Sequence, residues 1–143
     1  MALRISHQLP ALTLGLFVGL ILQEILLGIA DILTPQISLN AAIIGLEPMP
    51  GLTAIILACW FIGGLSAGLM ASLIGHSLTT GCVAGVLLML PALMLAQVSF
   101  AEQTTTAALF TINPLIAAAT GAWLAGRVNQ NLTQQRGSPT SDA

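Results

Sequence analysis

The sequence predicts an all-α integral membrane protein, a bundle of four transmembrane helices. Three observations predict this class: the composition, four apolar stretches of spanning length, and a total of only eight charged side chains. Of the 143 residues, 56% are hydrophobic and 6% are charged, and the mean hydropathy is +0.96. A soluble domain carries about 25% charged residues. Lipid is therefore the solvent expected for most of this surface.

The four apolar stretches cover residues 9–33, 52–75, 78–98 and 107–126. About 20 residues of helix cross a hydrocarbon core of about 30 Å, so each stretch is long enough. Because lipid offers no partner for backbone N–H and C=O groups, each is expected to be helical. Residues 1–128 then form one transmembrane domain.

The first stretch follows Arg4 and resembles a signal peptide only superficially. It is too long for the apolar core of a signal peptide, it contains Glu24, and no small-residue cleavage site follows it. We therefore expect a retained first helix.

The segments between the helices differ in length. The loop over 34–51 contains an apolar run at 41–44, which we expect to lie at the membrane surface as a short helix capped by Asn40. Only His76 and Ser77 separate the second and third stretches, so these should form an antiparallel pair. The polar segment 129–143 contains Gly and Pro and is expected to be a disordered tail.

The arginines predict the orientation. Arg4 precedes the first helix, and Arg127 and Arg136 follow the fourth, whereas the loops on the other side carry Glu47 and Glu102. The excess of arginine on cytoplasmic segments therefore predicts that both termini lie in the cytoplasm.

Small residues recur at intervals of four along all four stretches. Helices in lipid associate through close backbone contact across such residues. We expect the rows to hold the four helices together, and the alternative is that one row faces outward and binds another subunit. The residues predicted to pack helices are Gly15, Gly19, Gly64, Gly68, Ser72, Gly81, Gly85 and Gly121.

These rows also suggest an internal repeat. Residues 62–71 (IGGLSAGLMA) resemble residues 116–125 (IAAATGAWLA), and Gly15 and Gly19 have counterparts in Gly81 and Gly85. Such a pattern is typical of a parallel duplication of a helical hairpin, although a bias toward small residues produces the same likeness.

Three polar residues stand out within or near the spans: Glu24, Asp31 and Asn113. Helical spacing places Glu24 on a face with Phe17, Gly28 and Asp31. A different face of the first helix carries small or amide side chains: Gly15, Gly19 and Gln23. The first helix is therefore expected to have one close-packed side and one polar side.

Asn113 lies at a depth similar to that of Glu24, which predicts a hydrogen bond between them across the first and fourth helices. Three roles stay open for Glu24. It is a neutral carboxyl that holds helices together, a site for proton coupling or cation binding, or a group that pairs with a partner subunit.

Four other side chains carry weaker signals. Trp60 and Trp123 are expected to anchor helices at the two membrane interfaces. Cys59 and Cys82 differ in depth by about 15 Å along the helix axes, more than the about 7 Å between Cα atoms that a disulfide tolerates, so both should be free thiols. No cluster of metal ligands is evident, and none is expected at His76.

Most function classes find no support in the sequence. No catalytic triad, metalloprotease, phosphate-loop or dinucleotide motif is present, so neither an enzyme nor a cofactor is expected. A net charge of −2 and the lack of lysine argue against a nucleic-acid partner.

Two resemblances bear on function. The segments GGLSAGLMAS and GAWLAGR, with the tight turn between the second and third helices, resemble small uncharacterised bacterial inner-membrane proteins with four helices. This likeness implies a bacterial inner membrane and transfers no functional residue. The chain is also similar to small multidrug resistance transporters in its helix count and in Glu24, which would match their first-helix glutamate. It departs from them in having no Tyr and a longer outer loop.

Two functions follow as hypotheses. The first is an accessory or assembly subunit that packs into a larger membrane complex, supported by the many small-residue faces. The alternative is a small oligomeric transporter or channel that uses Glu24 as an intramembrane proton or cation site. A structural protein that acts by self-association is a third possibility.

Overall fold

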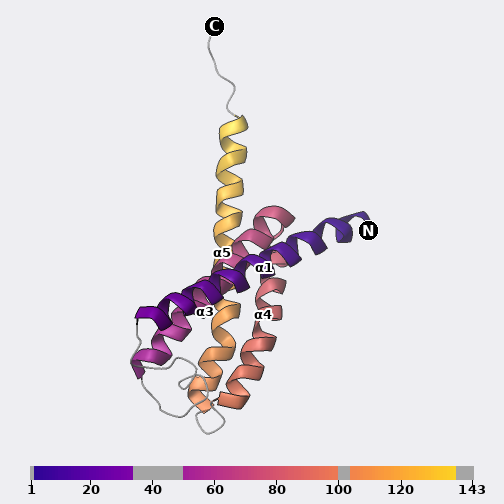
Figure 1. Ribbon diagram of the computed structural model, residues 1–143. Coiled ribbons are helices and arrows are strands. Elements are labelled where there is room, and N and C mark those ends of the chain that lie inside the picture. Colours follow the sequence, from indigo (N-terminus) through magenta and orange to yellow (C-terminus); the bar gives the residue numbers. More distant parts are fainter. Residues whose placement is uncertain (1, 34–49, 100–103, 138–143) are drawn as a thin grey trace.

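The computed structural model describes residues 2–33, 50–99 and 104–137, and all of its secondary structure is α-helical (Figure 1). The helices are α1 (Ala2–Leu33), α3 (Pro50–Gly75), α4 (Leu78–Ser99) and α5 (Thr104–Gly137). Within the described ranges there is no strand, so the all-α class is confirmed at this level.

Three of these helices are long and apolar enough to cross a membrane, over Gln8–Leu33, Thr53–Gly75 and Ala107–Asn131. In α4 the corresponding apolar stretch, Leu78–Ala92, is shorter. The structure thus gives three spanning candidates by length and composition where the sequence predicts four spans.

One helix extends well beyond its predicted end. The prediction of a disordered tail is corrected for residues 129–137, which continue α5 (Figure 1). The physical reason is that after Gly126 no Gly or Pro occurs before Gly137, so nothing interrupts the backbone hydrogen bonding of the helix. Residues 138–143 and the surface helix predicted at 41–44 lie outside the described residues.

The bundle is built from two hairpin-like pairs. α1 packs mainly on α3, α4 packs mainly on α5, and α3 and α5 pack on each other across the middle of the molecule (Figure 1). The tight turn at Gly75–Ser77 joins α3 to α4, and His76 adopts a left-handed backbone conformation there (φ 48°).

Glycines make the close contacts of each pair possible. A Cβ atom added at Gly19 of α1 would lie 2.6 Å from the Cβ of Ala67 and 2.7 Å from the carbonyl oxygen of Gly63, both on α3. At Gly85 of α4, a Cβ would lie 2.7 Å from the Cβ of Ala118 on α5. Real Cβ atoms do not approach so closely, so the two helices of each pair meet at backbone distance.

Glycines also bring α3 and α5 to backbone distance from each other. Gly68 lies against the backbone of Ala118, and Gly121 lies against the backbone of Leu65. Gly64 packs on Pro114, whose carbonyl oxygen would be 2.9 Å from an added Cβ. The eight residues predicted to pack helices are all buried between helices of this chain: Gly15, Gly19, Gly64, Gly68, Ser72, Gly81, Gly85 and Gly121.

Larger side chains fill the end of the bundle nearer the start of α3. Ile56 and Trp60 of α3, Ala92 of α4 and Phe110 of α5 form a buried cluster there. Partly buried apolar residues pack around it, including Leu27 of α1. Bulky packing at one end and glycine contacts elsewhere leave few polar side chains inside, and this makes the placement of the remaining polar groups informative.

Candidate functional site

Helix α1 presents two chemically different faces. Gly15, Gly19 and Gln23 face α3, and Gln23 is only 3% exposed, with its Cβ 2.9 Å from where a Cβ of Gly63 would lie. Glu24 is the next residue and is exposed. A helix turns by about 100° per residue, so one step along the chain separates a buried amide from an outward carboxyl.

The exposed side of α1 carries a continuous row at spacings of three and four residues. Its members are all exposed, and we call them the Glu24 face: Phe17, Leu20, Glu24, Gly28 and Asp31. Phe17 is 61% exposed, and a Cβ added at Gly28 would meet nothing within 4 Å. This face is covered by no helix of the chain that the structure describes.

Glu24 lies near the middle of the apolar span. The span Gln8–Leu33 has its midpoint between residues 20 and 21, which places Glu24 about 5 Å from it along the axis. Among the side chains that the structure describes, none donates a hydrogen bond or forms an ion pair with this carboxyl group. A polar group therefore faces outward near the middle of an apolar helix that is long enough to cross a membrane.

Asn113 is satisfied elsewhere. Its side-chain amide donates a 2.7 Å hydrogen bond to the carbonyl oxygen of Leu57 on α3. The predicted hydrogen bond between Glu24 and Asn113 is thus not formed, because α3 packs against α5 and its backbone accepts from Asn113. Glu24 meanwhile points away from the bundle, and Asp31 lies exposed two turns further along α1.

The two tryptophans have different surroundings. Trp60 is only 6% exposed and belongs to the buried cluster, so its predicted role as an interfacial anchor is corrected to a core role. The reason is that α4 and α5 converge on α3 at this level. Trp123 is half exposed, and the Arg127 guanidinium lies over its ring, 5.0 Å from the ring centroid.

Other chemically active side chains do not gather into a site. Cys59 is buried and Cys82 is partly buried, and both are free thiols. Within the described ranges, no three His, Cys, Asp or Glu side chains come close enough to hold a metal ion. The Ser72 hydroxyl is buried beside Gly81 without a hydrogen-bond partner there.

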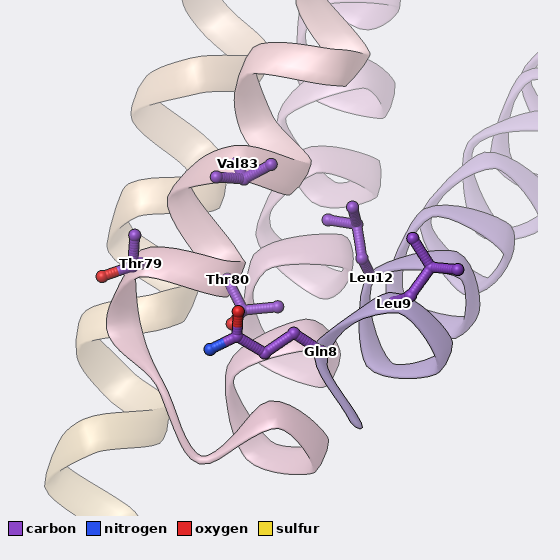
Figure 2. A pocket seen from close by; sticks show the side chains of 6 residues that line it. All are labelled: Gln8, Leu9, Leu12, Thr79, Thr80 and Val83. Carbon is purple, nitrogen blue, oxygen red and sulfur yellow. The ribbon is translucent and has the colours of Figure 1, made fainter. Parts of the chain in front are cut away.

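A pocket of about 190 Å³ lies between residues 8–12 of α1 and the first turns of α4 (Figure 2). Figure 2 shows the amide of Gln8 lying close to Thr80, with Leu9 and Leu12 on the α1 side of the pocket and Val83 above. Thr79 completes the lining. Glu24 is 16 residues from Gln8, about 24 Å along the helix, so the pocket is separate from the Glu24 face.

Sequence reasoning did not foresee this pocket. Its polar lining comes from Gln8, Thr79 and Thr80, and the only signal available was the pair of threonines directly after the turn at His76. None of the described lining residues carries a charge, so they show no chemistry that would identify a ligand.

Comparisons with known proteins find no matching family model, no matching curated protein and no matching solved structure. The function is therefore argued from the geometry of α1 alone.

Proposed function

We propose that this protein is a non-enzymatic accessory or assembly subunit of a larger membrane complex, and that it docks there through the Glu24 face of α1. The observation that carries the proposal is the outward position of Glu24, near the middle of an apolar span and without a partner among the described side chains. The proposal places the chain in a bacterial inner membrane, with both termini in the cytoplasm.

The energetic reason is the cost of a polar group in lipid. On insertion scales an Asp at the centre of a transmembrane helix costs about 2.5–3.5 kcal/mol, and Glu24 lies close to the centre. Ionisable residues in spans almost always face a bundle interior, a cavity or a partner. Among the described helices Glu24 does none of these, so the proposal assigns this role to an external partner.

This structural support for an accessory role differs from the support that the sequence suggests. The many small-residue rows point to a spare face for a partner, but all eight predicted packing residues are buried between helices of this chain. The unused face is instead the mixed apolar and acidic side of α1, with large side chains such as Phe17 and Leu20 standing out from it.

One version of the transport hypothesis is compatible with the exposed position of Glu24. Because Glu24 lies on the outside of the helices and not among them, a proton or cation pathway through Glu24 requires several copies arranged around it. An oligomeric transporter or channel is therefore the second candidate, and the two candidates differ in what surrounds α1 in the membrane.

Purification from the native membrane separates the two. The tagged full-length chain is extracted in a mild detergent, and the native mass and the co-purifying proteins are determined by mass spectrometry, for the wild type and for Glu24→Leu. A stoichiometric partner that is lost in Glu24→Leu supports the accessory role. Leu109→Glu, which places an acid on the exposed side of α5, is the matched control and should keep the partner.

Other outcomes contradict the accessory role. A pure homo-oligomer would move the transport hypothesis forward, and Glu24→Gln in a proton-coupled flux assay would then test it. A monomer without any partner would leave both hypotheses without support.

A further inference from the structure

We infer that the partner at the Glu24 face is a transmembrane helix of a different protein, which carries a basic or amide side chain at the depth of Glu24 and packs closely over Gly28. This inference rests on the proposed accessory function and names the chemistry of the partner.

The first step is that the chain cannot supply its own cation at this depth. Its basic residues are three arginines and two histidines, with no lysine. Arg4 is 20 residues from Glu24, about 30 Å along α1, and His7 is about 25 Å away. Arg127 lies over Trp123 near the end of the α5 span, and Arg136 lies further along at the end of α5. His76 lies in the turn after α3. A second copy in the same orientation would bring none of them to Glu24.

The second step is that four polar side chains in the other described helices already donate to backbone carbonyls of this chain, and that Ser72, which has no hydrogen-bond partner there, is itself buried. Asn113 donates to Leu57, and three hydroxyls donate within their own helices. These are Ser66 to Gly63, Thr111 to Ala107 and Thr120 to Ile116. Gln23 is buried against α3. A two-fold contact between copies across the Glu24 face would set one carboxyl against another and would bring neither a cation nor an amide to it.

The third step compares α1 with its counterpart in the repeat. Gly15 and Gly19 match Gly81 and Gly85, a shift of 66 residues, and the same shift takes Glu24 to Leu90 and Gly28 to Met94. Leu90 is 57% exposed and Met94 is 74% exposed. The outer face of α4 therefore offers lipid large apolar side chains at the two positions where α1 has an acid and a glycine.

The fourth step concerns shape. Gly28 lies one turn after Glu24 on the same face, and a Cβ there would meet nothing. A glycine on an exposed face lets the backbone of another helix approach, and in lipid such close approach supplies the van der Waals energy of association. Glu24 and Gly28 together thus form an acidic group beside a flat surface, which suits one helix with a hydrogen-bond donor at mid-depth.

The test uses the full-length protein in phospholipid vesicles and a synthetic polyleucine transmembrane helix as the probe. One labelled helix has a single Arg at its centre, and the matched helix has Leu there. Binding is measured by energy transfer to a dye on the protein. The Arg helix should bind the wild type about tenfold more tightly than the Leu helix, since interhelical hydrogen bonds in model peptides contribute about 1–2 kcal/mol.

Three variants locate the effect. Glu24→Leu should remove the preference for the Arg helix, and Gly28→Leu should weaken binding of the Arg helix about tenfold while leaving the acid in place. In the double variant Glu24→Leu/Leu90→Glu the acid moves to α4 next to Met94. That variant should bind the Arg helix more weakly than the wild type does, if the glycine contributes as proposed.

Two results would overturn the inference. Equal binding of the Arg and Leu helices by the wild type would show that Glu24 recruits no cation. Self-association of the wild type in the same vesicles, dispersed by Glu24→Leu, would show that a second copy occupies the face. A native complex that survives Glu24→Leu would leave the accessory role standing, while docking through the Glu24 face and this inference would both fail. Selective binding of the Arg helix by a protein that has no native partner would leave the chemistry inferred for Glu24 standing, while the accessory function would fail.

Discussion

α1 and α4 are the first helices of the two helix pairs, α1 with α3 and α4 with α5. Their inward faces are alike, and their exposed faces differ. Each carries two glycines four residues apart that bring it to backbone distance from the next helix, α3 or α5. On the outer side, α4 presents Leu90 and Met94, whereas α1 presents Glu24 and Gly28. Packing accounts for the shared inner faces, and it does not account for the acid.

This difference separates fold from function within one architecture. An inner face must keep small residues, because a Cβ at Gly19 or Gly85 would collide with the neighbouring helix. An outer face in lipid has only to be apolar. A polar exception on that unconstrained side is costly, so it points to an interaction that the four helices do not make.

The largest expected effects test the shared inner faces. Gly19→Leu and Gly85→Leu should each destabilise the protein by about 2 kcal/mol or more, because overpacking forces the helices apart. Gly28→Leu is the control and should be nearly neutral in the isolated protein, since space is open there. Reversible unfolding in mixed micelles, followed by circular dichroism, measures all three. Tolerance of leucine at position 19 but not at 85 would break the likeness between α1 and α4.

The next largest effects test the difference between the outer faces. Glu24→Leu should favour membrane insertion of the α1 segment, and Leu90→Glu should disfavour insertion of the α4 segment, each by about 2–3 kcal/mol on insertion scales. The measurement is the inserted fraction of each segment when it is placed in a host membrane protein. If Glu24→Leu left insertion of α1 unchanged, Glu24 would lie shallower than the helix register indicates.

A smaller effect tests whether any polar group of the chain reaches Glu24. Asn113→Leu should cost about 0.6 kcal/mol, the average for hydrogen bonds between membrane helices, and at most about 1.7 kcal/mol, because it removes the bond to Leu57. The double variant with Glu24→Leu should be additive within about 0.5 kcal/mol, as expected for sites that share no partner. A clear coupling energy in this cycle would restore the hydrogen bond predicted from the sequence.

These residues also show what the sequence alone can predict. Hydropathy identifies the helices, and the four-residue spacing of glycines identifies their contact faces, because both follow from the solvent and from helix geometry. The spacing separates the Gly19–Gln23 side of α1 from the Glu24 side, but it cannot say which neighbour covers each side. That depends on α3 lying against both α1 and α5, a tertiary fact. Burial of Trp60 and the bond from Asn113 to Leu57 depend on the same arrangement.

The continuation of α5 to Gly137 has a different cause. Residues 129–137 are polar, and such a composition predicts disorder. The helix nevertheless continues past the end of the apolar stretch. Between Gly126 and Gly137 no Gly or Pro occurs, so the backbone hydrogen bonding of α5 continues through this polar segment. The apolar stretch and the helix that contains it therefore differ in length in this chain.

The smallest expected effect concerns a charge that does have a partner. Arg127 lies over Trp123 on α5, and a cation over an exposed indole contributes about 0.5–1 kcal/mol. Arg127→Gln should therefore destabilise the protein by no more than this and should change the emission of Trp123, measured with Trp60→Phe as background. Glu24→Gln in the same background should leave that emission unchanged. Arg127 finds its partner within its own helix, whereas Glu24 has none among the described side chains, so the two variants contrast a paired charge with one for which we propose a partner in another molecule.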